Sequence, residues 1–307
     1  MQVSVIIPVY NAENFVETAV ESALLQPETE EVLLIEDGSP DNSLRLCREL
    51  SDKFEKVHLL QHPDRGNHGA GASRNLGINN ARFEFIAFLD ADDFYLKNRF
   101  KTAKSQFEKY HDIDGVYEAI GVYAEDRAAE KKWNSYSKSR LTIISRKVEP
   151  DDLFFELVSG KGGTISLVGL VVKKNIFKAC GLFDTTLKLH QDTAMVIKMS
   201  LYSKLVAGKF DQPVAMRRVH SGNRFLNEKN KLKTKSLFWK KVFQDLYSRN
   251  LDGRRLKFIF LNYLYSNLKA YKVNSLENTA IVFFQMILHP FLFLKSFHLF
   301  IKLKIER

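Results

Sequence analysis

Short runs of apolar, β-branched and aromatic residues recur along the first hundred positions, with amphipathic segments between them. Each run is short enough for one strand and is apolar almost throughout, as expected of parallel strands buried on both faces. The predicted strands are Val3–Val9, Val32–Glu36, Val57–Gln61 and Phe85–Leu89. The intervening segments show helical spacing and are Asn14–Leu25, Asp41–Leu50 and Ser73–Ala81. This alternation predicts an α/β fold with a mostly parallel sheet and helices on both faces.

The alternation loosens after the fourth strand. The pattern predicts a helix over Asn98–Tyr110, a strand over Gly115–Val122, a buried strand over Leu167–Val172 and an amphipathic helix over Gln191–Leu205. Ala124–Pro150 is polar and rich in Lys, Arg and Ser, so we expect a surface excursion or lid there.

The net charge of +10 is distributed unevenly along the 307 residues. Residues 230–307 hold 15 Lys and Arg against 4 Asp and Glu, whereas residues 1–229 carry a net charge of −1. Because the basic character is confined to one end, it does not indicate a nucleic-acid partner. Cys47 and Cys180 lack the spacing of a disulfide framework or a metal site, so we expect two reduced thiols. With no signal-like leader, the protein is expected in the cytoplasm.

The C-terminal region, residues 226–307, interleaves lysines and arginines with aromatic and aliphatic residues. Its most apolar stretch, Ala280–Leu294, is shorter than the roughly 20 residues that a membrane-spanning helix needs. This pattern favours helices that lie on an anionic membrane surface. The alternative is a helical cap that packs on the preceding domain with its lysines in water.

Chemically distinctive residues follow three of the predicted strands. They are Pro8-Val9-Tyr10-Asn11, Glu36-Asp37-Gly38-Ser39 and Asp90-Ala91-Asp92-Asp93. Ligands of open α/β sheets bind just beyond the carboxyl ends of the strands. Clustered carboxylates repel one another, so they are not expected there for stability alone. Asp90 and Asp92 lie one residue apart after a buried strand, an arrangement that suits Mg²⁺ or Mn²⁺ completed by phosphate oxygens and water.

The glycine-rich segment Gly66–Gly77 differs from the usual nucleotide-binding loops. Gly69-Ala70-Gly71 begins a Gly-x-Gly-x-x-Gly pattern, but Arg74 stands at the third glycine position. The segment also follows the third strand rather than the first, which disfavours a Rossmann dehydrogenase. No Gly-x-x-x-x-Gly-Lys occurs, which excludes a P-loop. Arg74 is interpreted as a neighbour of a diphosphate or metal site at a helix start, or simply as the ion-pair partner of one aspartate.

Four ordered motifs together resemble the family 2 inverting glycosyltransferases of the GT-A fold, of the non-processive type that builds bacterial surface polysaccharide or lipopolysaccharide. They are Val3-Ser4-Val5-Ile6-Ile7-Pro8-Val9-Tyr10-Asn11, Glu36-Asp37-Gly38-Ser39-Pro40-Asp41-Asn42-Ser43, Ser73-Arg74-Asn75-Leu76-Gly77 and Phe88-Leu89-Asp90-Ala91-Asp92-Asp93. The resemblance is close over residues 1–100 and looser to about Asn223. It implies a GT-A domain at 1–225, divided into a nucleotide-binding half at 1–100 and an acceptor and catalytic half at 101–225, followed by a helical extension at 226–307.

The resemblance also implies roles for individual residues. Those implied for nucleotide-sugar binding are Pro8, Val9, Tyr10, Asp37, Arg74, Asp90, Ala91 and Asp92. The first three would line the nucleobase pocket, and Asp37 would hydrogen-bond the base, usually uracil. Asp90 would lie near the ribose and sugar, and Asp92 would ligate Mg²⁺ or Mn²⁺ on the diphosphate.

The same resemblance implies a catalytic base and a second metal ligand. Gly181-Leu182-Phe183-Asp184 resembles the loop that shapes the donor and acceptor sites. His190-Gln191-Asp192 stands where the family carries its base, usually written Glu-Asp, which leaves Asp192 as the catalytic carboxylate. His220 matches a family histidine that completes the metal shell.

These parts predict metal-dependent transfer of one sugar from a nucleotide sugar, with UDP-sugars favoured, to an acceptor hydroxyl, by a single displacement with inversion at C1. Processive synthases carry Gln-x-x-Arg-Trp, and here neither Trp133 nor Trp239 follows an arginine. The expected acceptor is a glycan or lipid-linked glycan, met at the inner face of the cell membrane. The alternatives are a non-catalytic nucleotide-sugar or glycan-binding relative and a nucleotidyltransferase, although the glycine-rich basic loop of the latter is missing after the first strand.

Overall fold

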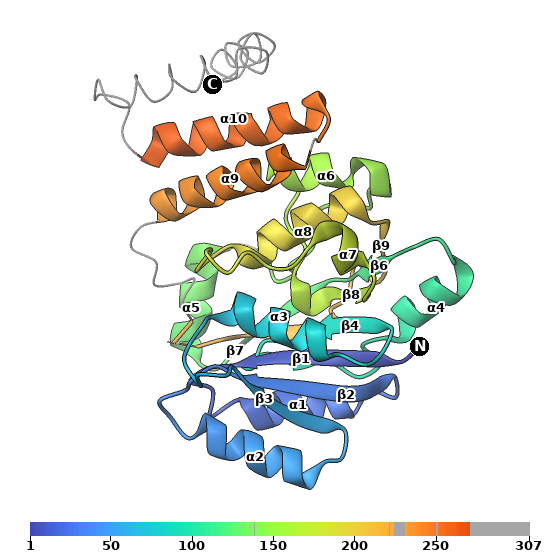
Figure 1. The fold of residues 1–307 in the computed structure, drawn as a ribbon, viewed down its shortest axis with the longest axis vertical. Helices are drawn as coiled ribbons and strands as arrows, with labels where there is room; N and C mark the ends of the chain where they lie inside the picture. Colours follow the sequence, from blue (N-terminus) through green and yellow to red (C-terminus); the bar gives the residue numbers. More distant parts are fainter. Residues whose placement is uncertain (138, 221, 224–230, 250, 271–307) are drawn as a thin grey trace. The chain divides into compact units, whose positions relative to one another are not determined.

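The computed structural model of this chain is shown in Figure 1. The residues that it describes are 1–137, 139–220, 222–223, 231–249 and 251–270. The chain divides into two compact units, Met1–Asn227 and Glu228–Arg307. Ala280–Leu294, the apolar stretch that is too short for a membrane-spanning helix, lies outside the described residues.

The first unit is built around a mostly parallel sheet. Among the described residues, its strands follow the order β3-β2-β1-β4-β8-β6-β9, and β8 is the strand that runs antiparallel to its neighbours. These strands are β1 (Val3–Val9), β2 (Thr29–Glu36), β3 (Val57–Gln61), β4 (Phe85–Phe88), β6 (Gly115–Tyr117), β8 (Leu170–Lys173) and β9 (Leu205–Ala207). The predicted mostly parallel α/β fold is confirmed.

Side chains of β1 alternate between two separate hydrophobic cores, one on each face of the sheet. Val5 and Ile7 join the core that includes Val20 of α1, whereas Ile6 joins the core that includes Ile78 of α3. Figure 1 shows α1 and α2 on one side of the sheet and α3, α7 and α8 on the other. The bounds of these five helices are α1 (Val16–Leu24), α2 (Ser43–Lys53), α3 (Ala70–Asn80), α7 (Ile176–Cys180) and α8 (Gln191–Tyr202); the unit also contains α4 (Lys101–Lys109) and α6 (Pro150–Ser159). Burial of each large aliphatic side chain stabilises the fold by about 1.5–3 kcal/mol.

Both cysteines lie buried in these cores without a disulfide between them, Cys47 on the α1–α2 side and Cys180 on the α3 side. Burial, reinforced by the charges of Glu36 and Asp41, raises the pKa of Cys47 to about 12. The thiol therefore stays protonated and unreactive, as expected of a core residue rather than a metal ligand.

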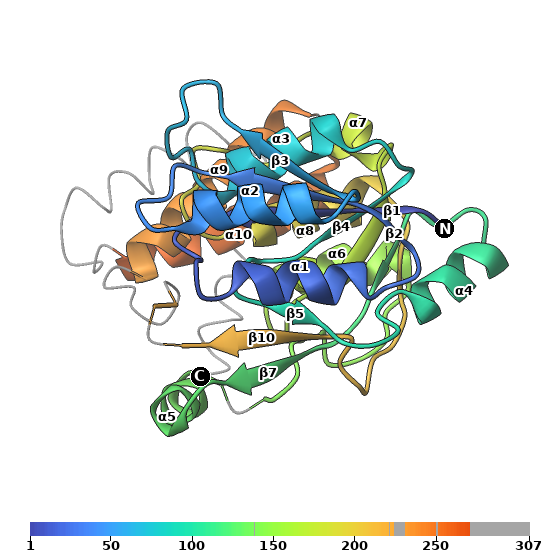
Figure 2. The same ribbon diagram turned by 90° about the horizontal axis from the view of Figure 1, so that it is seen from below.

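A smaller sheet lies beside the main one (Figure 2). Its central strand β10 (Ala215–Val219) is antiparallel to β5 (Phe94–Tyr95) and parallel to β7 (Ile120–Ala124). Helix α5 (Arg127–Tyr136) packs on it through Trp133, which is buried with residues of β7 and β10. The polar segment predicted as a surface excursion is thus anchored by Trp133 and, further along, by Ile144, which is buried in the core on the α3 side.

The prediction of a single strand over Gly115–Val122 is wrong. The chain leaves the main sheet after β6 and enters the small sheet as β7, and the fully buried Glu118 lies at the crossing. Its Oε2 accepts a hydrogen bond from Arg99 Nη1 over 2.9 Å, and its Oε1 accepts one from the Lys209 N–H over 3.0 Å. A buried charge needs such partners, and they come from distant parts of the chain that a local pattern does not reveal.

Three other predicted boundaries shift, the first two because a turn interrupts the apolar pattern. Leu167–Gly169 forms a 3₁₀ turn before β8, and α8 ends at Tyr202, ahead of β9. Helix α3 begins at Ala70, so Arg74 lies in its second turn and not at its start.

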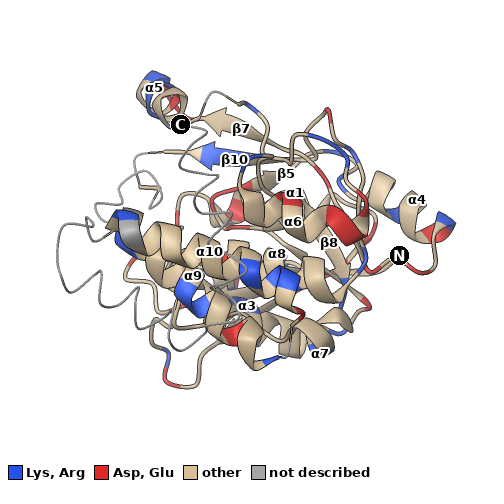
Figure 3. Ribbon diagram, turned by 90° about the horizontal axis from the view of Figure 1, so that it is seen from above, with Lys and Arg blue, Asp and Glu red and all other residues tan. Residues whose placement is uncertain are grey.

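The second unit contains, within its described residues, α9 (Lys231–Ser248) and α10 (Gly253–Ala270). Ser236 Oγ donates to Asn267 Oδ1 over 3.1 Å, and the Phe243 ring lies 5.3 Å from the Phe260 ring, an order that fits an antiparallel hairpin. Figure 3 shows basic residues along α9. No helix in the described ranges is long and apolar enough to cross a membrane.

Gly77→Ala is expected to loosen the packing of α3 on the sheet. An added Cβ would come within 2.5 Å of Ile6 Cγ2 and 3.1 Å of Ile35 Cδ1. Overpacking outweighs the gain in helix propensity, so the free energy of unfolding should fall by about 1–2 kcal/mol, as measured by urea titration. Gly253→Ala is the matched control because its added Cβ meets no atom within 4 Å. An unchanged or raised stability of Gly77→Ala would contradict the close approach.

Candidate functional site

The loops after β1, β2 and β4 meet at one edge of the sheet. Val9 pairs with Glu36 at the ends of β1 and β2, and β4 ends at Phe88 beside Ile6, three residues before the end of β1. The Asp37 N–H donates to the Val9 carbonyl over 2.9 Å. The parallel arrangement thus brings motifs that are far apart in the chain to one edge of the sheet. This edge, formed by the segments that follow the carboxyl ends of β1, β2 and β4, is the mouth of the candidate site.

The three residues expected to line the nucleobase pocket differ in how much of each side chain is exposed. Tyr10 is 45% exposed at the mouth, Pro8 is half-buried, and the Val9 side chain lies wholly in the core. Tyr10 is therefore the side chain of the three that is most available to a flat ring in this structure. Val9 serves the mouth through its backbone, which holds Asp37.

Asp37 organises the segment that leads into α3. Its Oδ1 accepts a hydrogen bond from the His68 N–H and its Oδ2 one from the Gly69 N–H, each over 2.8 Å. His62 Nε2 lies 3.4 Å from Oδ1. Only Oδ2 keeps a second lone pair without a partner in these contacts, and the Asp37 side chain is 3% exposed. Sequence reasoning missed His62 and His68, whose isolated positions carried no recognisable pattern.

Arg74 and Asp90 form an ion pair at the mouth of β4. The distance from Arg74 Nη2 to Asp90 Oδ1 is 2.6 Å, and the side chains of Arg74 and Asp90 are 7% and 43% exposed. The guanidinium carbon lies 5.6 Å from the centre of the Phe183 ring. Arg74 Nε is buried and has no hydrogen-bond partner in the described part of the chain. Because the Asp90 carboxylate is exposed, this ion pair is accessible to a ligand.

Asp92 and His220 come together although 128 residues separate them. His220 Nε2 lies 3.1 Å from Asp92 Oδ2, and Asn223 Nδ2 donates to the same oxygen over 3.1 Å. The side chains of Asp92 and His220 are 32% and 16% exposed, so an ion can reach them.

A carboxylate beside an imidazole supplies two ligands of a kind that Mn²⁺ accepts, with the remaining positions open to phosphate oxygens and water. Within the described ranges, no group of three or more His, Cys, Asp or Glu side chains could hold a metal by itself. The pair formed by Asp92 and His220 therefore fits a metal that binds together with a diphosphate.

Arg218 of β10 fastens the backbone around Asp92. Its Nε donates to the Asp92 carbonyl over 2.9 Å, and its own N–H donates to Asp93 Oδ1 over 2.9 Å. Its guanidinium carbon lies 5.2 Å, 5.4 Å and 5.5 Å from the ring centres of Phe15, Phe94 and Tyr123 respectively. These contacts fix the strand-end turn from the side of the small sheet.

Asp93 is buried behind this turn. Burial raises the pKa of Asp93 well above its ordinary value, and the charges of Asp92 and Asp90 add to the effect. Asp93 therefore supports the turn, whereas the side chains of Asp90 and Asp92 are partly exposed.

Asp192 lies in the first turn of α8, which begins after His190 in a left-handed conformation with φ of 61°. The carboxylate is exposed, and its Oδ1 accepts a hydrogen bond from the Thr193 N–H over 2.8 Å. Gln191 is turned towards α3, since a Cβ added to Gly71 would lie 2.1 Å from its Oε1. The glycine at position 71 thus provides room for Gln191 and not for a dinucleotide.

The Gly181–Asp184 loop also docks on α3. Asn75 brackets Phe183, because its Oδ1 accepts from the Phe183 N–H over 2.8 Å and its Nδ2 donates to the Phe183 carbonyl over 3.0 Å. Phe183 in turn contacts Arg74. Helix α3 therefore connects the Arg74–Asp90 pair with the segment that bears Asp192.

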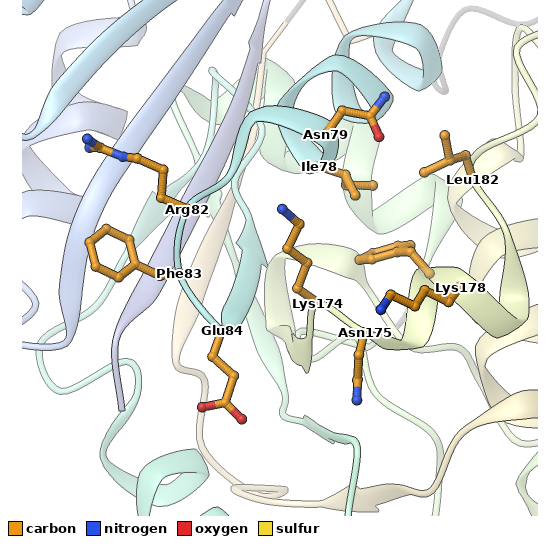
Figure 4. A pocket seen from close by; sticks show the side chains of 10 residues that line it. Ile78, Asn79, Arg82, Phe83, Glu84, Lys174, Asn175, Lys178 and Leu182 are labelled. Carbon is orange, nitrogen blue, oxygen red and sulfur yellow. The ribbon is translucent and has the colours of Figure 1, made fainter.

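A pocket of about 830 Å³ lies away from this mouth, at the start of β4 and the end of α3 (Figure 4). Lys174 Nζ donates to the Ala81 carbonyl over 2.6 Å, and Arg82 Nε lies 2.8 Å from Glu31 Oε2, so two of its basic groups serve the fold. Because Asp90 follows the opposite end of β4, this pocket is not part of the predicted site.

Comparisons with known proteins identify relatives of this chain. The family model described as Glycosyl transferase family 2 matches residues 4–158. An uncharacterized glycosyltransferase of Rickettsia typhi is 28% identical over 255 residues, which cover 81% of this chain and 74% of that protein. The minor teichoic acid biosynthesis protein GgaA of Bacillus subtilis is 27% identical over 219 residues, which cover 67% of this chain and 46% of GgaA.

Two solved structures resemble the fold. TarS residues 1–349 from S. aureus, in complex with UDP-GlcNAc, gives a TM-score of 0.64 at 18% identity, over 91% of this chain and 78% of that one. The mannosyltransferase PcManGT from Pyrobaculum calidifontis, in complex with GDP-Man and Mn²⁺, gives 0.53 at 15% identity, over 94% and 80%. These likenesses confirm the GT-A-type fold expected from the sequence.

Gly71→Ala is expected to push the Gln191 carboxamide away from α3. The displaced group is the end of a flexible side chain, so the free energy of unfolding should stay within about 1 kcal/mol of the parent value. Backbone amides in the first two turns of α8 should exchange faster with deuterium, as measured by mass spectrometry of the peptide that contains Asp192.

Gln191→Ala should accelerate exchange to the same degree, and the double variant should show no further increase, because the two changes remove one contact. Unchanged exchange in Gly71→Ala would contradict the docking of α8 through Gln191.

Proposed function

We infer the function of this chain from one premise: it belongs to glycosyl transferase family 2. It is therefore a glycosyltransferase. We propose that it transfers one sugar per encounter from a nucleotide sugar to an acceptor hydroxyl, with a divalent metal on the donor diphosphate and with inversion at C1.

The contact between Asp92 and His220 is the observation that carries this proposal. Two side chains from the ends of β4 and β10 approach to 3.1 Å at the mouth where ligands of such sheets bind. Asp92 and His220 would hold Mg²⁺ or Mn²⁺, which when bound supplies positive charge to the diphosphate leaving group. The Mn²⁺ in the PcManGT structure supports a metal in this fold.

Arg74 would assist departure of the diphosphate. Negative charge grows on the leaving oxygen as the C1–O bond breaks, and a nearby guanidinium stabilises that charge. Arg74 already binds the exposed Asp90 through Nη2, so a phosphate oxygen could take the place of that carboxylate while Arg74 keeps its position in α3. Asp90 would then be free to contact the ribose or the sugar.

Asp192 would act as the general base. Its carboxylate is exposed in the first turn of α8, where it can accept the proton of an acceptor hydroxyl as that oxygen attacks C1 from the face opposite the diphosphate. The neighbouring residue is the neutral Gln191, whose side chain is turned to Gly71, so Asp192 is the carboxylate available at this turn. A single base without a covalent intermediate gives inversion.

The donor is proposed to be a UDP-sugar and the acceptor a glycan or lipid-linked glycan of the bacterial surface. TarS, similar in fold, has been solved with UDP-GlcNAc, and GgaA, similar in sequence, is named for minor teichoic acid biosynthesis. Tyr10 and Asp37 would contact the base.

The C-terminal helices are proposed to meet the anionic surface at which a lipid-linked acceptor resides. Residues 231–270 hold ten Lys and Arg against two Asp and Glu, and Lys233 and Lys240 are exposed on α9. Rings such as Phe243 and Phe260 pack against each other in the hairpin, so attraction would come from charge more than from aromatic insertion.

Thermal stabilisation by a panel of UDP-, GDP-, CMP- and dTDP-sugars, each with Mn²⁺ or Mg²⁺, tests the donor site. UDP-sugars with metal should raise the melting temperature, since a ligand at 100 times its Kd adds about 2.7 kcal/mol to the stability of the folded state. Asp92→Ala should lose this shift, whereas the exposed Asp211→Ala should keep it. A shift with GDP-sugars alone would overturn the choice of UDP, and a full shift in Asp92→Ala would overturn the metal site.

Asp192→Asn is expected to abolish most sugar transfer while donor binding survives. Loss of a general base lowers kcat by about 10²–10⁴-fold, and the isosteric amide keeps the Oδ1 that accepts from Thr193. The rate is measured as UDP release with acceptor present, and the donor Kd by calorimetry; Asp211→Asn is the control. Retained turnover with lost donor binding would show that Asp192 is not the base. A wild-type chain that binds donor but transfers to no acceptor would favour the non-catalytic alternative.

A further inference from the structure

Asn223 connects both members of the proposed metal pair. It is 6% exposed and lies just beyond the end of β10. Its Nδ2 donates to Asp92 Oδ2 over 3.1 Å, and its Oδ1 accepts the backbone N–H of His220 over 2.7 Å. One carboxamide thus uses its donor on the carboxylate ligand and its acceptor on the backbone of the imidazole ligand.

We propose that Asn223 is a positioning residue that holds Asp92 and His220 in the arrangement that binds metal; this rests on the metal site proposed above. A carboxylate on a short side chain rotates freely unless one of its oxygens is held. A hydrogen bond to Oδ2 fixes that rotation, and outer partners of this kind are worth about 10–100-fold in metal affinity.

The chemistry of the amide explains why asparagine suits this position. A carboxamide is a donor and an acceptor at once, whereas an aspartate at 223 would offer no donor to Asp92 and would repel it. Alanine would leave the carboxylate without this partner and the His220 N–H without its acceptor.

Neighbouring contacts leave this task to Asn223. Arg218 holds Asp92 through the backbone carbonyl, so it does not set the direction of the carboxylate. The Gly222 N–H donates to His220 Nδ1 over 3.2 Å, a contact that reaches the ring on the side away from Asp92 and does not set the carboxylate. The carboxamide of Asn223 therefore links the two ligands, and the turn that carries it follows directly from β10.

The experiment is a titration of the full chain with Mn²⁺, with and without saturating UDP, in which free Mn²⁺ is followed by electron paramagnetic resonance. The variants are Asn223→Ala, the smaller change Asn223→Ser, Asp92→Ala, and the exposed Asn175→Ala as control. Asn223→Ala and Asn223→Ser should raise the Kd for Mn²⁺ by about 10–100-fold, with circular dichroism unchanged. Excess Mn²⁺ should restore their transfer rate, because the reacting groups are intact.

The outcomes separate the two proposals. Absence of Mn²⁺ binding by the parent, or binding that Asp92→Ala leaves unchanged, would refute the metal site and with it this inference. If the parent binds, Asp92→Ala loses the metal, and both Asn223 variants stay within about twofold of the parent, then the metal site stands and the role of Asn223 is refuted. A rate that excess Mn²⁺ fails to restore would also refute a role limited to positioning.

Discussion

Strand β1 pairs with β2 on one side and with β4 on the other, and both pairings are parallel. Parallel strands point their carboxyl ends in the same direction, so the residues that follow each strand arrive at the same edge of the sheet. Tyr10, Asp37 and Asp90 are neighbours for this reason. On its other side, β4 pairs with β8, which is antiparallel and ends the run of parallel neighbours. The second half of the candidate site, with Asp192 and His220, comes from the chain after β8.

Asp90, Asp92 and Asp93 lie within four positions of the chain, and each side chain has a different environment. Asp90 is exposed and paired with Arg74, Asp92 is held by a histidine and an amide, and Asp93 is buried with a raised pKa. Like charges this close could not all face one ligand, because mutual repulsion would drive protonation or movement. These different surroundings suit the three side chains to different tasks: the proposed sugar contact for Asp90, the proposed metal binding for Asp92, and support of the turn for Asp93.

Much of the first half of the site could be predicted because its motifs follow directly on strands with strong apolar patterns. Asp37, Asp90 and Asp92 each sit one to four residues after such a strand, so the strand prediction locates them. The second half resisted prediction for a physical reason. Glu118 interrupts an apolar run with a buried charge whose partner, Arg99, is remote, and the split of that run into β6 and β7 was missed. Arg218 and Asn223 act on Asp92 from 126 and 131 residues away, a distance that no local pattern spans.

The long separation between Asp92 and His220 has a consequence for how the protein is made. Strand β10 is the middle strand of the small sheet, so β5 and β7 have no common partner until it is in place. A ribosome delivers domains from the N-terminus onward, and the Asp37 and Arg74 side of the mouth is synthesised long before residues 220–223 emerge. A nascent or truncated chain that ends before β10 therefore contains Asp37, Arg74 and Asp92 but lacks His220, the proposed partner of Asp92. With the metal site as proposed, the two ligands can meet only after β10 has joined β5 and β7.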